Sequence, residues 1–310
     1  MTSPLLTSAN HYQVPAPGAL NVDHVAHFVP HADAASVALE KVGFTLTPFS
    51  AHSHRTEPGG PLVPAGTGNR CAMLQRGFIE FLTPTGDTQV AHQLRSAIQR
   101  YVGVHLIAFG TGAPAADHAR LVKAGFAPLD PVSLQREIDT EQSRETARFT
   151  VVRVPPGTMP EGRIQFCQHH TPQLLWQPRW MVHPNRAAAL AGVILRVADA
   201  QEAAQRFARY TGLLAQVSGS VWRIDTTRGF LVFVDRDTLH RRLDVVPPTL
   251  PWIAGTVLKS DDIGATGDYL RKAGVPVNVL GNQRLLVKLP PAVGGVLMFE
   301  PKNSGALNFD

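Results

Sequence analysis

Apolar and polar positions alternate in two short runs near the start of the chain, and alternation of this kind predicts β-strands. The first run, residues 21–30, carries His24 among apolar neighbours. The second, residues 76–84, carries Glu80 in the middle of an apolar stretch bounded by Gly and Pro. An ionised carboxylate among apolar side chains is costly unless it is paired or bound to a metal. The pattern therefore predicts a partner for Glu80, and His24 is the candidate.

The residues around and between these runs predict a helix, a loop and a hairpin. Apolar residues at helical spacing fill residues 33–44, with Asp33 as the expected N-cap and a glycine near the end. The Gly-, Pro- and His-rich residues 50–68 predict a mobile surface loop that covers whatever site exists. Residues 69–74 and the Glu80 run predict a hairpin.

The same order recurs four times along the chain, which indicates internal repeats. Four predicted helices end in Gly plus an apolar residue, at Gly43, Gly125, Gly212 and Gly274, and each follows a strand-like run that begins about twenty residues earlier. The equivalent first-strand positions are His24, His105, Gly192 and Gly255, and the equivalent last-strand positions are Glu80, Gln165, Val232 and Met298. Polar groups occupy these positions only in the first two units. We therefore expect a functional N-terminal half and a degenerate C-terminal scaffold.

Composition limits the class of protein. The chain has 310 residues, 44% hydrophobic and 17% charged, which indicates a soluble globular protein of one large domain or two ordinary ones. The formal net charge is +5, but Lys and Arg are scattered, which argues against nucleic-acid binding. Cys71 and Cys167 lie in apolar strand patterns, as buried free thiols do. Residues 1–19 predict a loose arm without signal-peptide features, and no apolar run is long enough to span a membrane, so we expect a cytoplasmic protein.

Repeated βαβββ units, with a histidine on the first strand and a carboxylate on the last, resemble the vicinal oxygen chelate superfamily, which includes glyoxalase I, extradiol dioxygenases and bleomycin-resistance proteins. More narrowly, residues 23–29, 66–70, 78–82 and 166–172, followed by Trp176, Trp180 and residues 183–185, resemble glyoxalase-like domain proteins. The resemblance covers residues 20–185 well. The remaining residues resemble the family only in the order of their predicted strands and helices.

The resemblance implies an α+β fold in which four βαβββ units pair into two cup-shaped mixed β-sheets with flanking helices. After an N-terminal arm, residues 1–19, it implies an N-terminal glyoxalase-like domain at residues 20–185 and a degenerate one at residues 186–310. Fold alone does not fix the reaction.

The resemblance also implies a metal on the floor of the N-terminal cup, held by His24, Glu80, His105 and Gln165. This donor set suits Fe(II), Mn(II), Ni(II) or Zn(II) with open positions for a chelating substrate. Glu80 and Gln165 would then be the catalytic residues. An amide cannot take up a proton at neutral pH, which argues against glyoxalase I activity itself.

Alternation along the strands gives the expected lining of the cup. The residues that would share a face with the four ligands are Ala26, Phe28, Phe78, Leu82, Ile107, Phe109, Arg163 and Cys167. Phe28, Asn69, Phe109 and Arg163 are the candidate substrate-binding residues of this mostly apolar cavity, and Arg163 could bind a carboxylate.

Other interpretations of these residues stay open. His105 could equally be a core histidine bonded to backbone, and His24 with Glu80 could be a buried ion pair in a cup without a metal. Four further histidines are not expected to be ligands, because two lie on a flexible stretch and the other two are adjacent on a strand and so face opposite ways. They are His52, His54, His169 and His170. We expect Trp176, Trp180 and His183 to pack the segment that links the halves.

Three classes of function follow. The first is a metal-dependent lyase, isomerase or dioxygenase that acts on a small oxygen-chelating substrate. The second is a metal-free protein that binds or sequesters a small molecule, in the manner of the bleomycin-resistance proteins. The third is a structural protein with a filled cup. The expected partner is a small molecule rather than nucleic acid or membrane, and the sequence leaves open whether the cup forms within one chain or across a homodimer.

Overall fold

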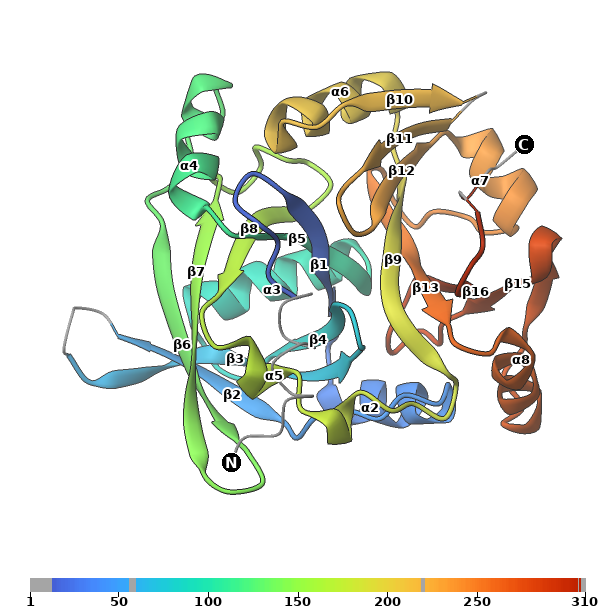
Figure 1. The fold of residues 1–310 in the computed structure, drawn as a ribbon, viewed down its shortest axis with the longest axis horizontal. Helices are drawn as coiled ribbons and strands as arrows, with labels where there is room; N and C mark the ends of the chain where they lie inside the picture. Colours follow the sequence, from blue (N-terminus) through green and yellow to red (C-terminus); the bar gives the residue numbers. More distant parts are fainter. Residues whose placement is uncertain (1–12, 56–59, 219–220, 306, 308–310) are drawn as a thin grey trace.

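The computed structural model describes residues 13–55, 60–218, 221–305 and 307 (Figure 1). Within these residues the chain forms one 16-stranded mixed sheet with helices packed on it, an α+β fold as the sequence predicts. Two separate sheets were expected, but the strands of the two halves are joined in one hydrogen-bonded network. The junction lies where β13 meets β5, at the pair Ile253 and Val104.

The first half of the chain builds one side of this sheet. Its strands are β1 (Leu20–Phe28), β2 (Ser50–Arg55), β3 (Leu62–Met73), β4 (Phe78–Pro84), β5 (Gly103–Thr111), β6 (Val132–Asp139), β7 (Arg144–Arg153) and β8 (Arg163–His169). Its helices are α2 (Ala32–Lys41), α3 (Gln89–Arg100) and α4 (Pro114–Lys123). β1 pairs in parallel with β4, β5 pairs in parallel with β8, and β1 and β5 lie antiparallel at the centre.

The second half has the same pairing pattern. A linking segment with α5 (Pro172–Leu175) and η1 (Pro178–Trp180) leads into it. Its strands are β9 (Ala187–Arg196), β10 (Ala215–Ser218), β11 (Val221–Asp225), β12 (Phe230–Val234), β13 (Trp252–Ser260), β14 (Asn278–Leu280), β15 (Arg284–Lys288) and β16 (Val296–Pro301). Its helices are α6 (Ala200–Thr211), α7 (Arg236–Leu243), α8 (Ile263–Lys272) and the short η2 (Gly281–Gln283). β9 and β12 are parallel, β13 and β16 are parallel, and β9 and β13 are antiparallel.

The glycines that end the helices are the most reliable local signal in the sequence. Helices α2, α4, α6 and α8 each end within two residues of a glycine whose φ lies between 65° and 92°. Glycine enters this left-handed region without the steric cost that a side chain adds, so the predicted helix ends are confirmed. The predicted cap of the first helix is wrong: the N-cap is His31, and Asp33 lies in the first turn.

The prediction of a mobile loop at residues 50–68 is also wrong. β2 and β3 pair antiparallel through this stretch, so its backbone hydrogen bonds are made within the sheet. The ring of Phe49 covers Gly68 so closely that a Cβ at this glycine would lie 2.2 Å from the Phe49 Cζ atom. Here glycine allows close packing on a strand rather than a turn. Residues 56–59 lie outside the described residues.

Apolar packing occupies both faces of the sheet. On one face the four glycine-terminated helices cover a continuous core, whose members include Val25, Leu39, Ile107, Leu121, Phe166, Phe207 and Leu270. On the other face α3 packs Leu94 against Phe28 in the N-terminal half, and α7 packs Leu239 and Leu243 in the C-terminal half. Each half of the sheet therefore has apolar packing on both of its faces. None of the helices in the described residues is long and apolar enough to cross a membrane.

Candidate metal site

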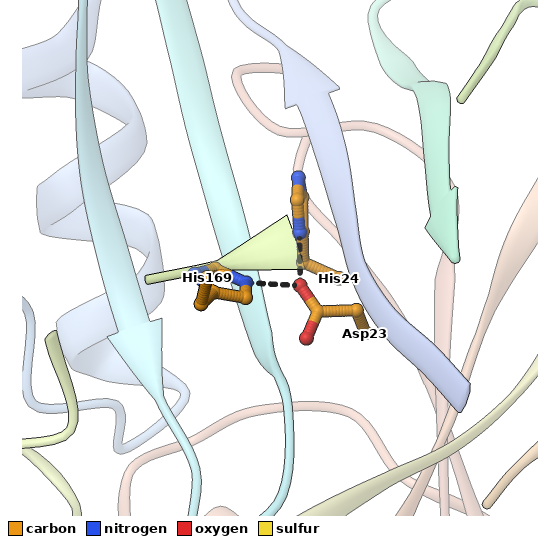
Figure 2. A group of neighbouring side chains, drawn as sticks. All are labelled: Asp23, His24 and His169. Atoms are coloured by element: carbon orange, nitrogen blue, oxygen red, sulfur yellow. Dashed lines mark hydrogen bonds and ion pairs between the residues drawn. The ribbon is translucent and has the colours of Figure 1, made fainter. Parts of the chain in front are cut away.

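Asp23, His24 and His169 form a buried cluster on the face of the sheet that α3 covers (Figure 2). His24 Nδ1 donates to Asp23 Oδ2 at 2.6 Å, and His169 Nε2 donates to the same oxygen at 2.9 Å. Within the described residues this is the only group of three or more His, Cys, Asp or Glu side chains whose ligand atoms all lie within 4.8 Å of one another. This cluster is the candidate metal site of the protein.

A β-bulge in β1 brings two adjacent residues of this cluster to the same face. Val22 and His24 pair with consecutive residues of β5, so Asp23 is the extra residue of the bulge. Val22 and Val25 both face the helix-covered core, and Asp23 and His24 between them both face the other way. Gly110 leaves room for the carboxylate, because a Cβ there would lie 3.3 Å from Asp23 Oδ1.

His169 stands at the end of β8. It follows Gln165 and Cys167 at the two-residue period of a strand, so all three side chains share one face. The neighbouring His170 faces the other way, where its Nε2 atom lies 2.8 Å from Thr150 Oγ1. The sequence argument that adjacent histidines diverge is confirmed, and the structure places His169, which was not expected to be a ligand, in the cluster with Asp23 and His24. The two-residue period of a strand, counted from Gln165, places His169 on the same face as Gln165 and would have identified it as a candidate.

Electrostatics couples Asp23 to His169. Burial raises the pKa of the Asp23 carboxyl, but the two imidazoles, His169 above all, lower it well below its usual range. Burial lowers the pKa of His169, but the Asp23 charge outweighs this and raises it to about 10. With no metal bound, the two side chains are therefore a carboxylate and an imidazolium at neutral pH.

Two buried atoms of the cluster have no hydrogen-bond partner among the described residues: Asp23 Oδ1 and His169 Nδ1. A buried carboxylate oxygen without a donor costs free energy, and such an atom calls for an unseen ligand. Two imidazoles and one carboxylate are also the donor set of the facial triad that holds divalent transition metals. Both the donor chemistry and the orphaned oxygen fit a divalent metal at this position.

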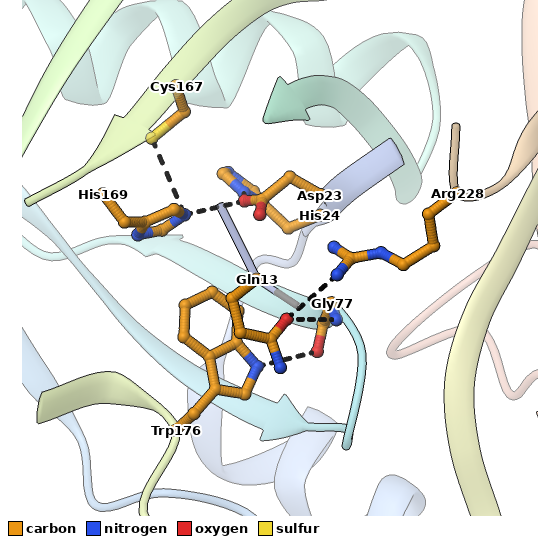
Figure 3. A network of polar contacts seen from close by, with 8 residues as sticks. All are labelled: Gln13, Asp23, His24, Gly77, Cys167, His169, Trp176 and Arg228. Atoms are coloured by element: carbon orange, nitrogen blue, oxygen red, sulfur yellow. Dashed lines mark hydrogen bonds and ion pairs between the residues drawn. The ribbon is translucent and has the colours of Figure 1, made fainter. Parts of the chain in front are cut away.

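A second layer of contacts ties the cluster to the C-terminal half (Figure 3). Gln13 Oε1 accepts from Gly77 N at 3.3 Å and from Arg228 Nη1 at 3.2 Å. Burial lowers the pKa of Arg228, and the charge of Asp23 opposes this effect. Gln13 is itself buried, so the predicted loose arm is packed at this end, and residues 1–12 lie outside the described residues.

The linking segment closes one side of the cluster, as the sequence predicts. Trp176 Nε1 donates to Gly77 O at 3.4 Å, and the indole lies edge-on to His169 with ring centroids 5.0 Å apart (Figure 3). His183 donates through Nε2 to Met73 O at 2.8 Å. These contacts confirm a packing role for Trp176 and His183.

Glu80 lies on the same face as His24 but outside the cluster. In the parallel pairing of β1 and β4, His24 stands opposite Phe78, and Glu80 stands opposite Ala26. The ring of Phe78 therefore stacks on His24, with centroids 4.4 Å apart. Asn69 Nδ2 donates to Glu80 Oε1 at 2.5 Å, so the partner of the carboxylate is an amide rather than His24.

His105 and Gln165, the other two expected ligands, also lie outside the cluster. His105 Nε2 donates to Tyr101 O at 2.7 Å, and its ring stacks on Tyr101 with centroids 3.9 Å apart. Burial lowers the pKa of His105 to about 4, so the ring is neutral. The structure thus favours the core-histidine interpretation. Gln165 lies in the same row as His24, with Ala108 of β5 between them.

Among the expected pocket-lining residues, Ile107 and Phe109 lie on the opposite face. A second bulge, at His105, shifts the alternation along β5. Phe109 is consequently buried in the helix-covered core, with its ring centroid 5.8 Å from that of Phe166. Phe28 lies on the expected face, and Arg163 Cζ is 5.8 Å from its ring.

His52, in the 50–68 stretch, lies outside the cluster. His52 lies on β2, with its Nδ1 atom 3.1 Å from Thr67 Oγ1. The side chain of His54 lies outside the described residues.

A family model described as a glyoxalase-like domain matches residues 22–211, which is more than half of the chain and includes Asp23, His24 and His169. Among curated protein sequences, none matches the chain.

Solved structures share the fold at low sequence identity. A hypothetical protein from Staphylococcus aureus aligns with a TM-score of 0.61 at 11% identity, over 91% of this chain and 99% of that chain. A variant of 4-hydroxymandelate synthase from Streptomyces coelicolor aligns with a TM-score of 0.52 at 13% identity, over 94% and 95%. The Mn(II)-bound glyoxalase from Novosphingobium aromaticivorans aligns with a TM-score of 0.50 at 9% identity, over 92% and 82%. At these identities the likeness shows the fold alone.

Proposed function

Because the chain belongs to the glyoxalase-like domain family of the vicinal oxygen chelate superfamily, we propose that it is a metal-dependent lyase or isomerase acting on a small oxygen-chelating substrate. The observation that carries the proposal is the buried cluster of two histidines and one aspartate with an orphaned carboxylate oxygen. Asp23, His24 and His169 would hold the ion, which is Fe(II), Mn(II), Ni(II) or Zn(II) by its donor set. When bound, the metal would act as a Lewis acid toward negative charge on the substrate oxygens.

The protein's own groups prepare this site. Asp23 keeps a proton on His169 at neutral pH, and that proton must leave before the imidazole can act as a ligand. The rings of Phe78 and Trp176 pack beside the two histidines and exclude water from them. Exclusion of water strengthens the electrostatic interactions inside the site.

Glu80 would be the general base. Its carboxylate is oriented by Asn69, whose Oδ1 atom accepts from Arg136 Nη1 at 3.1 Å, so a chain of two hydrogen bonds fixes its position. Glu80 stands two residues beyond Phe78 on the same face of β4, roughly 7 Å along the strand. A substrate held at the cluster could therefore present a carbon-bound proton to it. With Asp23 as ligand and Glu80 as base, the site has two carboxylates. The amide of Gln165 is then not needed for the proton transfer.

We also interpret the recurring order of one strand, one helix and three strands as four repeats of one unit, grouped into domains at residues 20–185 and 186–310. The parallel pairing of first and last strands in each unit supports this interpretation. The C-terminal equivalents of the expected ligand positions, Gly192, Val232, Gly255 and Met298, offer no imidazole or carboxylate. This supports a catalytic site in the N-terminal half.

Metal titration of the chelator-treated protein tests the proposal. Isothermal titration calorimetry with Mn²⁺, Ni²⁺ and Zn²⁺, and anaerobically with Fe²⁺, should show one site per chain. The Asp23→Ala and His169→Ala variants should lose it. Glu80→Gln is the matched control, since it should keep the metal and lose turnover. If none of the four ions binds the protein more tightly than it binds Asp23→Ala, the metal-dependent function is wrong.

A metal-free binding protein of the bleomycin-resistance type is the second candidate. The observation that favours it is that Asp23 Oδ2 is already satisfied by His24 and His169 without an ion. A thermal-shift screen of the chelated protein separates the two candidates. Small aromatic or apolar ligands should raise the melting temperature of a metal-free binder, and divalent ions should raise that of the enzyme.

A further inference from the structure

A cavity of about 420 Å³ lies at the boundary between the two halves. Its walls come from Gln75 and Arg76 of the N-terminal half and from β9, β11, the β11–β12 turn, the start of β12, β13, β16 and the chain after β16. This volume falls within the range of small-molecule sites. None of the metal-cluster residues lines it.

The lining is strongly basic. Its charged members are Arg76, Arg223, Arg228, Lys259, Lys302, Asp225 and Glu300. The carboxylates are already paired: Glu300 with Lys259 at 2.8 Å and Arg284 at 3.0 Å, and Asp225 with Arg223 at 2.7 Å. Lys302 pairs with Asp261 at 2.9 Å. With these partners included, six cations and three carboxylates lie in or beside the cavity, and the charge of Asp23 acts on Arg228 from outside it.

Arg223 presents a donor that lacks an acceptor. Its Nε and Nη2 atoms bond to Asp225, and its guanidinium lies 3.8 Å over the ring of Phe230. The remaining Nη1 atom is buried and has no hydrogen-bond partner among the described residues. A buried donor without an acceptor costs free energy, and an oxygen atom in the cavity would satisfy it.

The guanidinium groups of Arg76 and Arg228 both line the cavity. Burial lowers the pKa of Arg228, the charge of Asp23 opposes this effect, and the charge of Arg76 adds to it. An anion between Arg76 and Arg228 would relieve the repulsion of these two like charges. Phe230 and Ala191 supply an apolar surface beside them.

We propose that this cavity binds a small organic anion, with a carboxylate or phosphate group at Arg76, Arg223 and Arg228 and an apolar or aromatic body against Phe230. Arginine is suited to this task because its planar fork of donors matches both groups. The site uses no metal and lies outside the proposed catalytic cluster, so the chain would carry two ligand sites, one in the N-terminal half and one at the boundary between the halves.

Calorimetric titration at low ionic strength tests the proposal with benzoate, phenyl phosphate, inorganic phosphate and benzyl alcohol as probes. We expect saturable binding of benzoate or phenyl phosphate, weaker binding of inorganic phosphate, which lacks the aromatic body, and none of benzyl alcohol. The comparison of the first two probes identifies the preferred anionic group. Arg76→Ala and Arg223→Gln should each weaken binding by at least about tenfold, the usual effect of removing a charged hydrogen bond. Lys288→Ala, which removes a half-exposed cation paired with Asp244 elsewhere, should leave it unchanged.

Absence of saturable binding up to millimolar concentrations of both aromatic anions, or equal affinities in the wild type and the Arg76→Ala variant, would overturn the proposal. Arg76 is exposed on a turn, so its variant should fold even if Arg223→Gln does not. Metal titrations of the Arg76→Ala variant should match those of the wild type. Failure of the anion site is thereby distinguishable from failure of the proposed metal site.

Discussion

His169 Nε2 lies 2.9 Å from Asp23 Oδ2, although the two residues are 146 positions apart in the chain. The contact joins the bulge in β1 to the end of β8, and β5 lies between these two strands in the sheet. It therefore forms only when both halves of the N-terminal sheet are assembled. The same two side chains would be metal ligands, so folding and metal binding depend on one pair of residues.

His169→Ala should destabilise the protein by about 3–5 kcal/mol, because it leaves the fully buried Asp23 carboxylate without its main counter-charge. Urea unfolding followed by circular dichroism measures the change. His170→Ala, at an exposed neighbour on the opposite face, is the matched control and should stay within about 0.5 kcal/mol of the wild type. Similar losses in both variants would show that the ion pair contributes little.

Metal affinity should rise with pH. Because Asp23 raises the pKa of His169 to about 10, this imidazole is protonated at neutral pH and must release its proton when the metal binds. Below that pKa the apparent affinity should therefore increase about tenfold per pH unit. Calorimetric titrations at several pH values, in buffers of different ionisation enthalpy, measure both the affinity and the proton released. A pH-independent affinity with no proton release would exclude His169 as a ligand.

Acid should destabilise the fold through His27. Burial lowers the pKa of His27 to about 4, below the value of about 6.5 expected in the unfolded chain. Between these values the unfolded state binds a proton that the folded state excludes, so stability is lost as the pH falls from about 6.5 to 4 and is unaffected above that window. The loss attributable to His27 is on the order of 3 kcal/mol. His27→Phe should flatten this part of the stability profile measured by urea unfolding, and an unchanged slope would contradict the assignment.

The sequence predicted those features that depend on local pattern. Strands around His24 and Glu80, the hairpin between β3 and β4 and the glycine-ended helices follow from periodicity and from the conformational freedom of glycine. The site was predicted less well, because β-bulges at Asp23 and His105 break the two-residue period on which the assignment of faces depends.

The sequence contains one indication of the bulge at Asp23. Val22 and Val25 are both core residues three positions apart, which a regular strand cannot place on one face. The hydrogen-bond partner of Glu80 could not be predicted from a pattern of this kind. Asn69 reaches it from the start of the predicted hairpin strand, and the pairing depends on the register of β3 and β4.

Gly77→Ala should destabilise the protein by about 2 kcal/mol or more and weaken metal binding. Gly77 has a φ of 76°, which costs an L-residue about 1–2 kcal/mol, and a Cβ there would lie 2.6 Å from the backbone oxygen of Asp23. Relief of that clash must move the bulge that positions the carboxylate. Gly157→Ala is the matched control, since Gly157 has a φ of 89° but nothing within 4 Å of its added Cβ. Urea unfolding and metal titration of both variants separate the backbone cost from the clash. If the two substitutions cost the same and neither changes metal affinity, the close approach of Gly77 to Asp23 does not shape the site.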